Sequence, residues 1–500
     1  MQLSSASNQL WFKLALFFTA SFLAVLFGMI AITNNPILIG LAVGMILGLF
    51  LLANPKISIW LVIVLGLGTP ALLDMAGHGL SRMLWAISML GLLLWVPGVM
   101  HLFSLNPQHK KITPLYIWIA VLFVVFALAS TALQLHSFNE LFGGFKRYFQ
   151  GFGLMLVLAT MPWAKADFDR WLKALLAIAL LQLPFALFER FILVPLRGGI
   201  ESAGGEATDV VAGTMGANLQ GGSPNSIMVF FVLLAFTFVV ARWKEQLLST
   251  GKACILSAFL LLPLALGETK IVIVLLPMIG VLLLMKDIQR EPSKFMPVLL
   301  LMLVLTFGLA YMYVYLMLES TFIEALEGVM KYNIQEMGYG KLLLNRTTVF
   351  TFWAGLHDWS NPINFLFGHG LGSSYGAGFD AGHMAQLYPK YGINLTTIST
   401  LLWDLGVVGL VLYISILAVA WLQMGRIERH TTDPQLRADS LSIRVGIALC
   451  VVFLMYSDSQ INLIVHEIII AVMLGYGAFL YRQHHASQIQ TRNMSTQLQR

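Results

Sequence analysis

The sequence predicts an all-α polytopic membrane protein with about fourteen transmembrane helices and one large extracytoplasmic loop that carries short amphipathic helices. Hydrophobic residues make up 58% of the chain and charged residues only 11%, whereas a soluble domain carries about 25% charged residues. Apolar runs long enough to cross a bilayer recur along the chain. Alternate loops also separate by charge, with the basic excess on the side that holds both termini, so we expect both termini in the cytoplasm.

A transmembrane helix needs roughly 20 mostly apolar residues. The first such run is too long for the apolar part of a cleavable signal peptide, so we interpret it as the first span. The last residues before Ile271 read Gly-Glu-Thr-Lys, which predicts a tight hairpin between the ninth and tenth runs. The predicted spans are 14–32, 37–53, 57–73, 83–103, 114–133, 148–161, 171–193, 226–243, 253–266, 271–285, 295–318, 401–424, 443–456 and 463–481.

The basic balance and the cysteines exclude several classes of protein. The net charge of +6 comes from basic residues in the cytoplasmic loops, where contact with anionic lipid explains them, so no nucleic acid partner is expected. The two cysteines, Cys254 and Cys450, both fall in predicted spans. Neither a disulfide nor a cysteine metal site is therefore expected.

The chain divides into three predicted regions. Residues 1–267 hold the N-terminal transmembrane helices, and residues 426–500 hold the last transmembrane helices and a cytoplasmic tail. The region between them, 268–425, contains the large outer loop 319–400, and loops of such length are often functional.

Two helices are expected in the outer loop. Residues 319–335 can form an amphipathic helix, and residues 346–359 read as a second helix with Asn345 as its N-cap. Val349, Phe350, Trp353 and Leu356 fall on one face of the second helix. That face is a candidate for contact with the membrane interface, where Trp is enriched.

Basic residues on the outer side depart from the charge pattern and need an explanation. One reading is an anionic ligand at the outer interface, because Arg binds phosphate in a bidentate fork and Lys acts as a point charge. The other reading is local ion pairing, or side chains that extend their charge to the membrane surface. The outward basic residues are Arg82, Lys146, Arg147, Arg190, Arg197, Lys270, Lys331, Lys341, Arg346 and Lys390.

The outer loop also holds the candidate acid and base groups. Histidine suits general base catalysis near neutral pH, although a lone loop histidine is more often only solvated. The candidates are His357, Asp358, His369, Asp380 and His383. No pattern with metal-ligand spacing is present, so no metal site is expected.

Two further features have open readings. The glycine-rich stretch 368–374 either cradles a phosphate with backbone amides or serves as a hinge. Asp404 and Glu467 lie in or near spans, where ionisable groups are functional suspects. His466 and Glu467 form either a polar contact between helices or a proton relay, and a relay would favour a transporter.

Four motifs follow one another in an informative order. Lys270 opens a span after the Gly-Glu-Thr-Lys turn, and Arg346 heads the Trp-bearing segment RTTVFTFW. NPINFLFGHGLG follows, and then DLGVVG, which begins at Asp404. Over residues 268–412 this order resembles the O-antigen ligase and O-antigen polymerase superfamily of bacterial inner membranes. The His-Asn pair of the ligases is absent from YGINLTTIST, where Asn394 alone remains, so a polymerase is favoured.

The resemblance implies a glycosyltransferase that takes glycan from a polyprenyl-diphosphate-linked donor to an acceptor hydroxyl at the extracytoplasmic face. It implies Arg147, Lys270 and Arg346 as diphosphate-binding residues and His369 or His383 as the catalytic residue, with no metal, nucleotide or other cofactor. The expected partners are the lipid-linked oligosaccharide, membrane lipid and other polysaccharide assembly proteins. The alternative is a multi-span transporter or flippase of lipid-linked sugars or small solutes.

Overall fold

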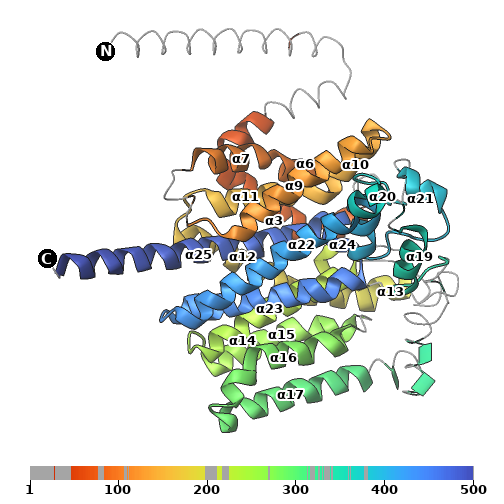
Figure 1. Ribbon diagram of the computed structural model, residues 1–500. Coiled ribbons are helices and arrows are strands. Elements are labelled where there is room, and N and C mark those ends of the chain that lie inside the picture. Colours follow the sequence, from red (N-terminus) through yellow and green to blue (C-terminus); the bar gives the residue numbers. More distant parts are fainter. Residues whose placement is uncertain are drawn as a thin grey trace, which may run out of the picture. The chain divides into compact units, whose positions relative to one another are not determined.

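The computed structural model describes residues 28, 47–76, 84–105, 110, 112–196, 211–216, 224–267, 271–311, 314–315, 321, 323–324, 327–328, 330, 338, 342–358, 360, 362–376 and 381–498. Contacts divide the chain into two units, residues 1–58 and 59–500. Every element assigned within the described residues is helical, which confirms the all-α class (Figure 1). The α-helices are α3 (Pro55–Gly68), α4 (Pro70–Met75), α6 (Leu84–Leu93), α7 (Trp95–Ser104), α9 (Leu115–Leu133), α10 (Phe138–Phe149), α11 (Phe152–Thr160), α12 (Lys165–Phe188), α13 (Val194–Leu196), α14 (Asn225–Lys244), α15 (Thr250–Leu266), α16 (Val272–Ile288), α17 (Pro292–Tyr311), α19 (Thr348–Leu356), α20 (Pro362–Phe367), α21 (His383–Leu387), α22 (Thr397–His430), α23 (Pro434–Tyr456), α24 (Ser459–Asn462) and α25 (Ile464–Leu498).

The described helices include spans of membrane length. Seven are long and apolar enough to cross a membrane, or eight if Leu47–Ala53 and Pro55–Gly68 together count as one span. The chain is therefore a helical membrane protein, while the predicted number of about fourteen spans is not confirmed. The seven are Leu84–Ser104, Leu115–Leu133, Lys165–Leu196, Asn225–Lys244, Thr397–His430, Pro434–Tyr456 and Ile464–Ala486.

Several predicted spans form helices at or below the lower limit of about 17 residues for crossing a bilayer. Helix α15 and helix α16 have 17 residues each. The predicted span 148–161 is divided between the end of α10 and α11, which has only 9 residues. The division falls at Gly151, where a Cβ would lie 2.7 Å from Cβ of Glu467. Close packing of α25 at this point interrupts a run that is apolar in sequence.

The ninth and tenth predicted spans correspond to α15 and α16, and the tight hairpin expected between them stays a prediction. Helix α15 packs against α12 and α14, whereas α16 packs against α17, α14 and α23. Their connection, residues 268–270, lies outside the described residues, as does nearly all of the first predicted span, 14–32. Cys254 and Cys450 are free cysteines, the first exposed and the second buried.

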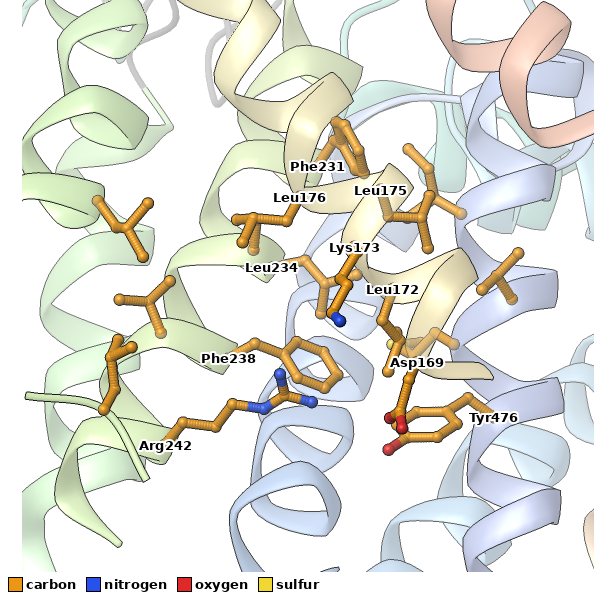
Figure 2. Close-up of a pocket in the computed structure, with 17 residues that line it drawn as sticks. Asp169, Leu172, Lys173, Leu175, Leu176, Phe231, Leu234, Phe238, Arg242 and Tyr476 are labelled. Carbon is orange, nitrogen blue, oxygen red and sulfur yellow. The ribbon is translucent and has the colours of Figure 1, made fainter. Parts of the chain in front are cut away.

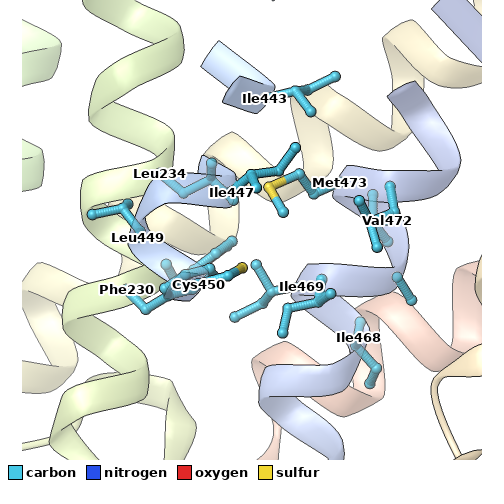
Figure 3. Packing of buried hydrophobic residues seen from close by; sticks show 14 of the residues in the cluster. Phe230, Leu234, Ile443, Ile447, Leu449, Cys450, Ile468, Ile469, Val472 and Met473 are labelled. Carbon is cyan, nitrogen blue, oxygen red and sulfur yellow. The ribbon is translucent and has the colours of Figure 1, made fainter. Parts of the chain in front are cut away.

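The core of unit 59–500 is built around α25. In its membrane-length segment, 89% of the 18-residue stretch with the highest hydropathy is buried inside the protein. The corresponding share is 72% for α14 and for α23. Figure 3 shows Phe230 and Leu234 of α14, Cys450 of α23 and Met473 of α25 meeting in this core. The three helices are apolar around most of their circumference because protein surrounds them.

The second predicted outer-loop helix is present as α19. The Asn345 side-chain oxygen accepts hydrogen bonds from the backbone N–H groups of Thr347 at 2.9 Å and Thr348 at 2.8 Å, which confirms its capping role. Val349 and Trp353 are buried in a cluster with Trp403 of α22. Phe350 packs against the same cluster, whereas Leu356 is 49% exposed, so the expected contact of this face with the membrane interface stays a prediction. The other expected helix, 319–335, lies largely outside the described residues.

Helix α22 is interrupted at Gly406, whose φ of 65° and ψ of −167° leave the helical region. A Cβ at Gly406 would lie 2.5 Å from the carbonyl carbon of Leu366, so the backbone of the preceding loop fills the interruption. The carbonyls of Trp403 and Asp404 accept hydrogen bonds from the backbone N–H groups of His369 at 2.9 Å and Gly370 at 2.8 Å. Glycine is required because a side chain would prevent this approach.

Candidate functional site

The glycine loop, residues 368–376, encloses the carboxylate of Asp404. Asp404 accepts hydrogen bonds from Ser373 Oγ and the Ser374 N–H, both at 2.8 Å, and from the Gly372 N–H at 3.1 Å. The hydroxyl of Tyr148 adds a fourth donor at 3.0 Å. Backbone amides converge here as they do around phosphates. The group they hold is the chain's own carboxylate, so this loop is a structural clasp rather than the phosphate cradle considered from the sequence.

Helix α10 presents one functional face to this loop. Glu140, Gly144 and Arg147 are spaced at i, i+4 and i+7, which places them on one side of a helix. Gly144 allows the contact, because a Cβ there would lie 2.4 Å from the carbonyl carbon of Leu371. The helix therefore brings a carboxylate and a guanidinium to the glycine loop from the same face.

The carboxylate of Glu140 holds His383. Oε1 of Glu140 lies 2.8 Å from His383 Nδ1, and Oε2 accepts a hydrogen bond from the His383 backbone N–H at 3.3 Å. Glu140 is 9% exposed and His383 26% exposed at their side chains. A carboxylate accepts the hydrogen bond, so Nδ1 carries the proton and the neutral ring has its lone pair on Nε2. This is the arrangement of a general base oriented by a carboxylate.

Four histidines gather beside the glycine loop, and we call them the histidine cluster: His136, His357, His369 and His383. The ring of His136 stacks on that of His383 with centroids 4.6 Å apart, and the centroids of His369 and His383 are 6.2 Å apart. His357 is buried, His369 and His383 are half-buried and His136 is exposed. The cluster thus leads from the protein interior to its surface.

The inner pair of the cluster has an assignable proton arrangement. His357 Nδ1 lies 3.1 Å from the carbonyl of Trp353, which can only accept, so Nδ1 is the protonated nitrogen. His357 Nε2 then accepts from His369 Nε2 at 2.9 Å. Burial, together with the neighbouring His357 and His383, lowers the pKa of His369 to about 4. Burial also lowers the pKa of His357, so both rings are neutral at pH 7.

Arg147, one of the two predicted diphosphate-binding residues that the structure describes, lies against the glycine loop. Its guanidinium carbon is 3.6 Å from the centre of the Tyr375 ring. The carbonyl of Tyr375 in turn accepts a hydrogen bond from the Gly382 N–H at 2.8 Å, next to His383. Arg147 and His383 are therefore connected through a single residue of the glycine loop.

Arg346 lies against a different tyrosine. Its Nε donates to the carbonyl of Tyr456 at 2.7 Å, and its guanidinium carbon lies 4.4 Å from the centre of that ring. The chain after Tyr456 leads into α24, which packs on α10. Nearby, burial raises the pKa of Asp458 to about 6, against the opposing effect of its hydrogen bond with Asn462.

Several sequence-predicted residues fall outside the described part of the chain. Lys270, the third residue expected to bind diphosphate, is among them, so the three-residue arrangement stays a prediction. The others are Arg82, Arg197, Lys331, Lys341 and Asp380.

The intramembrane pair His466–Glu467 forms polar contacts between helices. Glu467 accepts from Gln150 Nε2 at 2.6 Å and from the Gly151 N–H at 2.9 Å. His466 Nδ1 lies 2.8 Å from Ser459 Oγ. Both side chains therefore make polar contacts where α25 meets its neighbours. This arrangement fits the polar contact between helices that the sequence suggested as one of two interpretations.

Sequence reasoning missed His136 and Glu140. A local signal was present, because Ser137 followed by Glu140 is the spacing of a helix N-terminus. In the structure Ser137 Oγ accepts from the Glu140 N–H at 3.2 Å. That signal marks the start of α10, the helix on which Glu140 and Arg147 share one face.

Fold and site together define a helical membrane protein with a polar cluster at one end of its helices. Comparison of the chain with protein-family models finds no match, and comparison with curated proteins finds none either. Among the described residues, no group of three or more His, Cys, Asp or Glu side chains has the arrangement of a metal site.

Proposed function

We propose that the chain is a glycosyltransferase that polymerises glycan from a polyprenyl-diphosphate-linked donor onto an acceptor hydroxyl. The observation that carries this proposal is the shared face of α10. Glu140 orients His383 from that face, and Arg147 stands two helical turns away, roughly 10 Å along the axis. A base and a cation at this separation suit an acceptor hydroxyl and a diphosphate leaving group on either side of one anomeric carbon.

His383 is the general base in the proposed reaction. Its Nε2 takes the proton of the acceptor hydroxyl while the acceptor oxygen forms a bond to the anomeric carbon. The bond between that carbon and the phosphate oxygen breaks, and the polyprenyl diphosphate leaves with the bonding electrons. The carboxylate of Glu140 stabilises the imidazolium that forms, as in other carboxylate–histidine pairs.

Arg147 supplies charge for the leaving group. Negative charge grows on the bridging phosphate oxygen as the bond breaks, and a guanidinium placed there before the reaction stabilises it. Arg can bind two phosphate oxygens at once, and the guanidinium of Arg147 lies over the Tyr375 ring beside the glycine loop. Lys270 and Arg346 complete the proposed diphosphate-binding set.

His369 has a supporting role in this proposal. Its Nε2 donates to His357, so that nitrogen is unavailable as a base. The pair stays neutral at pH 7 and places an uncharged ring beside His383, which keeps the base free to accept a proton. The resemblance implied either His369 or His383 as the catalytic residue, and in this proposal the catalytic residue is His383.

The proposed setting is the inner membrane of a bacterium, with both termini in the cytoplasm and the site at the extracytoplasmic face. The partners are the lipid-linked oligosaccharide, membrane lipid and other polysaccharide assembly proteins. The chemistry requires no nucleotide and no metal, because the diphosphate donor is already activated.

The test is the lipid-linked intermediate that accumulates when the protein is removed from cells. A polymerase leaves single repeat units on the lipid at the outer face, and wild-type protein restores long chains, but His383→Asn does not. Accumulated long chains on the lipid would identify a ligase instead. Repeat units trapped at the inner face would identify a flippase and contradict the proposal.

A further inference from the structure

A cavity of about 280 Å³ lies among α12, α14, α15 and α25, away from the histidine cluster. Its walls are mainly apolar, and Figure 2 shows leucine and phenylalanine side chains pointing into it from α12 and α14. The volume is near the lower end of the roughly 300–1,000 Å³ typical of ligand clefts. The labelled apolar side chains are Leu172, Leu175, Leu176, Phe231, Leu234 and Phe238.

Charged groups gather at one end of this cavity. Asp169 and Lys173 are four residues apart in the first turns of α12, and Arg242 is in the last turn of α14. Figure 2 places Asp169, Arg242 and Tyr476 together, with Phe231 at the other end. Helix ends lie at the membrane surface and helix interiors lie in hydrocarbon, so the cavity has a polar mouth and an apolar depth.

Arg242 is already engaged. Its Nε and one terminal nitrogen donate to Asp439 at 2.8 and 2.9 Å, and the Tyr476 hydroxyl donates to the same carboxylate at 2.6 Å. This group joins α14, α23 and α25 at the polar end of the cavity. Across the described residues, no ion pair of 4.0 Å or less involves Asp169 or Lys173, so one carboxylate and one ammonium remain at the mouth.

We propose that this cavity binds a phospholipid with a phosphoethanolamine headgroup. The lipid phosphate lies against Lys173, its ammonium lies against Asp169, and one acyl chain enters between α12 and α14. The charge balance selects a zwitterionic headgroup, because a purely anionic one would meet Asp169 as well as Lys173. Among zwitterionic headgroups, phosphoethanolamine has N–H groups that can donate to the Asp169 carboxylate, whereas the trimethylammonium of phosphocholine has none. An acyl chain matches the apolar walls, and lipid is the surrounding solvent.

The lipid site is independent of the proposed glycosyl transfer. Trp403, beside the histidine cluster, lies near the start of α22, and Asp439 lies just beyond the turn that follows its last residue, His430. The polar mouth is therefore toward the opposite end of α22 from the histidines. By the charge pattern of the loops, that end is the cytoplasmic one.

The experiment uses the full chain in nanodiscs of phosphatidylcholine that contain a photoactivatable phosphatidylethanolamine. Crosslinks are mapped by mass spectrometry, and unlabelled phosphatidylethanolamine, phosphatidylglycerol and polyprenyl phosphate compete. We expect crosslinks in α12, α14 and α25, with phosphatidylethanolamine the best competitor. Stronger competition by phosphatidylglycerol or polyprenyl phosphate would overturn the proposal, as would crosslinks confined to other helices.

Matched variants separate binding from misfolding. Leu176→Trp fills the cavity and should abolish the mapped crosslinks, whereas Leu181→Trp, at an exposed position of the same helix, should leave them unchanged. Asp169→Asn should reduce the preference for phosphatidylethanolamine over phosphatidylglycerol by about two- to five-fold, the range of an exposed ion pair. Equal effects of the two tryptophan variants, or an unchanged preference in Asp169→Asn, would refute the assignment.

Discussion

The exchange Glu140→Gln tests the proposed base most sharply, because it removes charge and keeps shape. The carboxylate lies 2.8 Å from His383 Nδ1 and is 9% exposed, so solvent screens the pair only weakly. A hydrogen bond to a charged group contributes about 1.5–3 kcal/mol. If the imidazolium forms in the transition state, loss of about 2–3 kcal/mol there lowers kcat by about 30- to 150-fold.

The assay is glycan polymerisation by purified protein in liposomes that contain the polyprenyl-diphosphate-linked repeat unit. We expect kcat to fall while KM for the donor stays unchanged, since Glu140 contacts the base and not the donor. Asn139→Ala, at an exposed neighbouring position on α10, is the control and should keep wild-type kcat. A kcat for Glu140→Gln within the error of wild type, in a protein of normal thermal stability, would refute the role of the pair.

Three further predictions concern the surrounding groups. Arg147→Ala should lower kcat/KM by about 100-fold, and Arg147→Lys by less, in the same assay; Arg170→Ala, on exposed α12 surface, should have no effect. The pKa of His369 is lowered from 6.5 to about 4, so the unfolded chain binds more protons than the folded chain between these two pH values. The free energy of unfolding should therefore fall as the pH drops below 6.5, by up to about 3 kcal/mol. Thermal unfolding across that range should therefore show a weaker pH dependence in His369→Gln, and an equal dependence would contradict the assignment. Asp404→Asn should lower Tm by the equivalent of about 2–4 kcal/mol, because the amide nitrogen would face N–H donors; an unchanged Tm would show that the clasp contributes little.

Local sequence signals determined much of the helical structure. Apolar runs at 114–133, 226–243 and 463–481 correspond to membrane-length helices, because hydrocarbon requires every backbone group to bond within its own helix. Asn345 was recognisable as a cap because its side chain replaces missing helical partners nearby in the chain. Such signals depend only on neighbouring residues.

The number of spans could not be obtained in the same way. Residues 148–161 are apolar enough to suggest one span, yet the helix stops where Gly151 meets Glu467 of α25. Likewise α19 has the composition of an interfacial helix, yet its Val349 and Trp353 are buried in one cluster with Trp403. Hydropathy measures transfer out of water, and it does not distinguish burial in lipid from burial against protein.

The histidine cluster required the tertiary structure. His136 precedes α10, His357 follows α19, His369 lies in the glycine loop and His383 follows that loop, so no spacing in the sequence relates them. The interruption at Gly406 brings them together, since it allows His369 and Gly370 to bond with the carbonyls of α22. A glycine within an apolar run carries no indication of which distant backbone will fill the space it leaves.

The most direct measurement is the release of polyprenyl diphosphate by the purified chain in liposomes, followed together with growth of the glycan. Wild-type protein should release one polyprenyl diphosphate for every glycosidic bond that it forms, and His383→Asn, folded to the same Tm, should release almost none. Equal release by both proteins, or no glycan growth with either, would contradict catalysis by the Glu140–His383 pair.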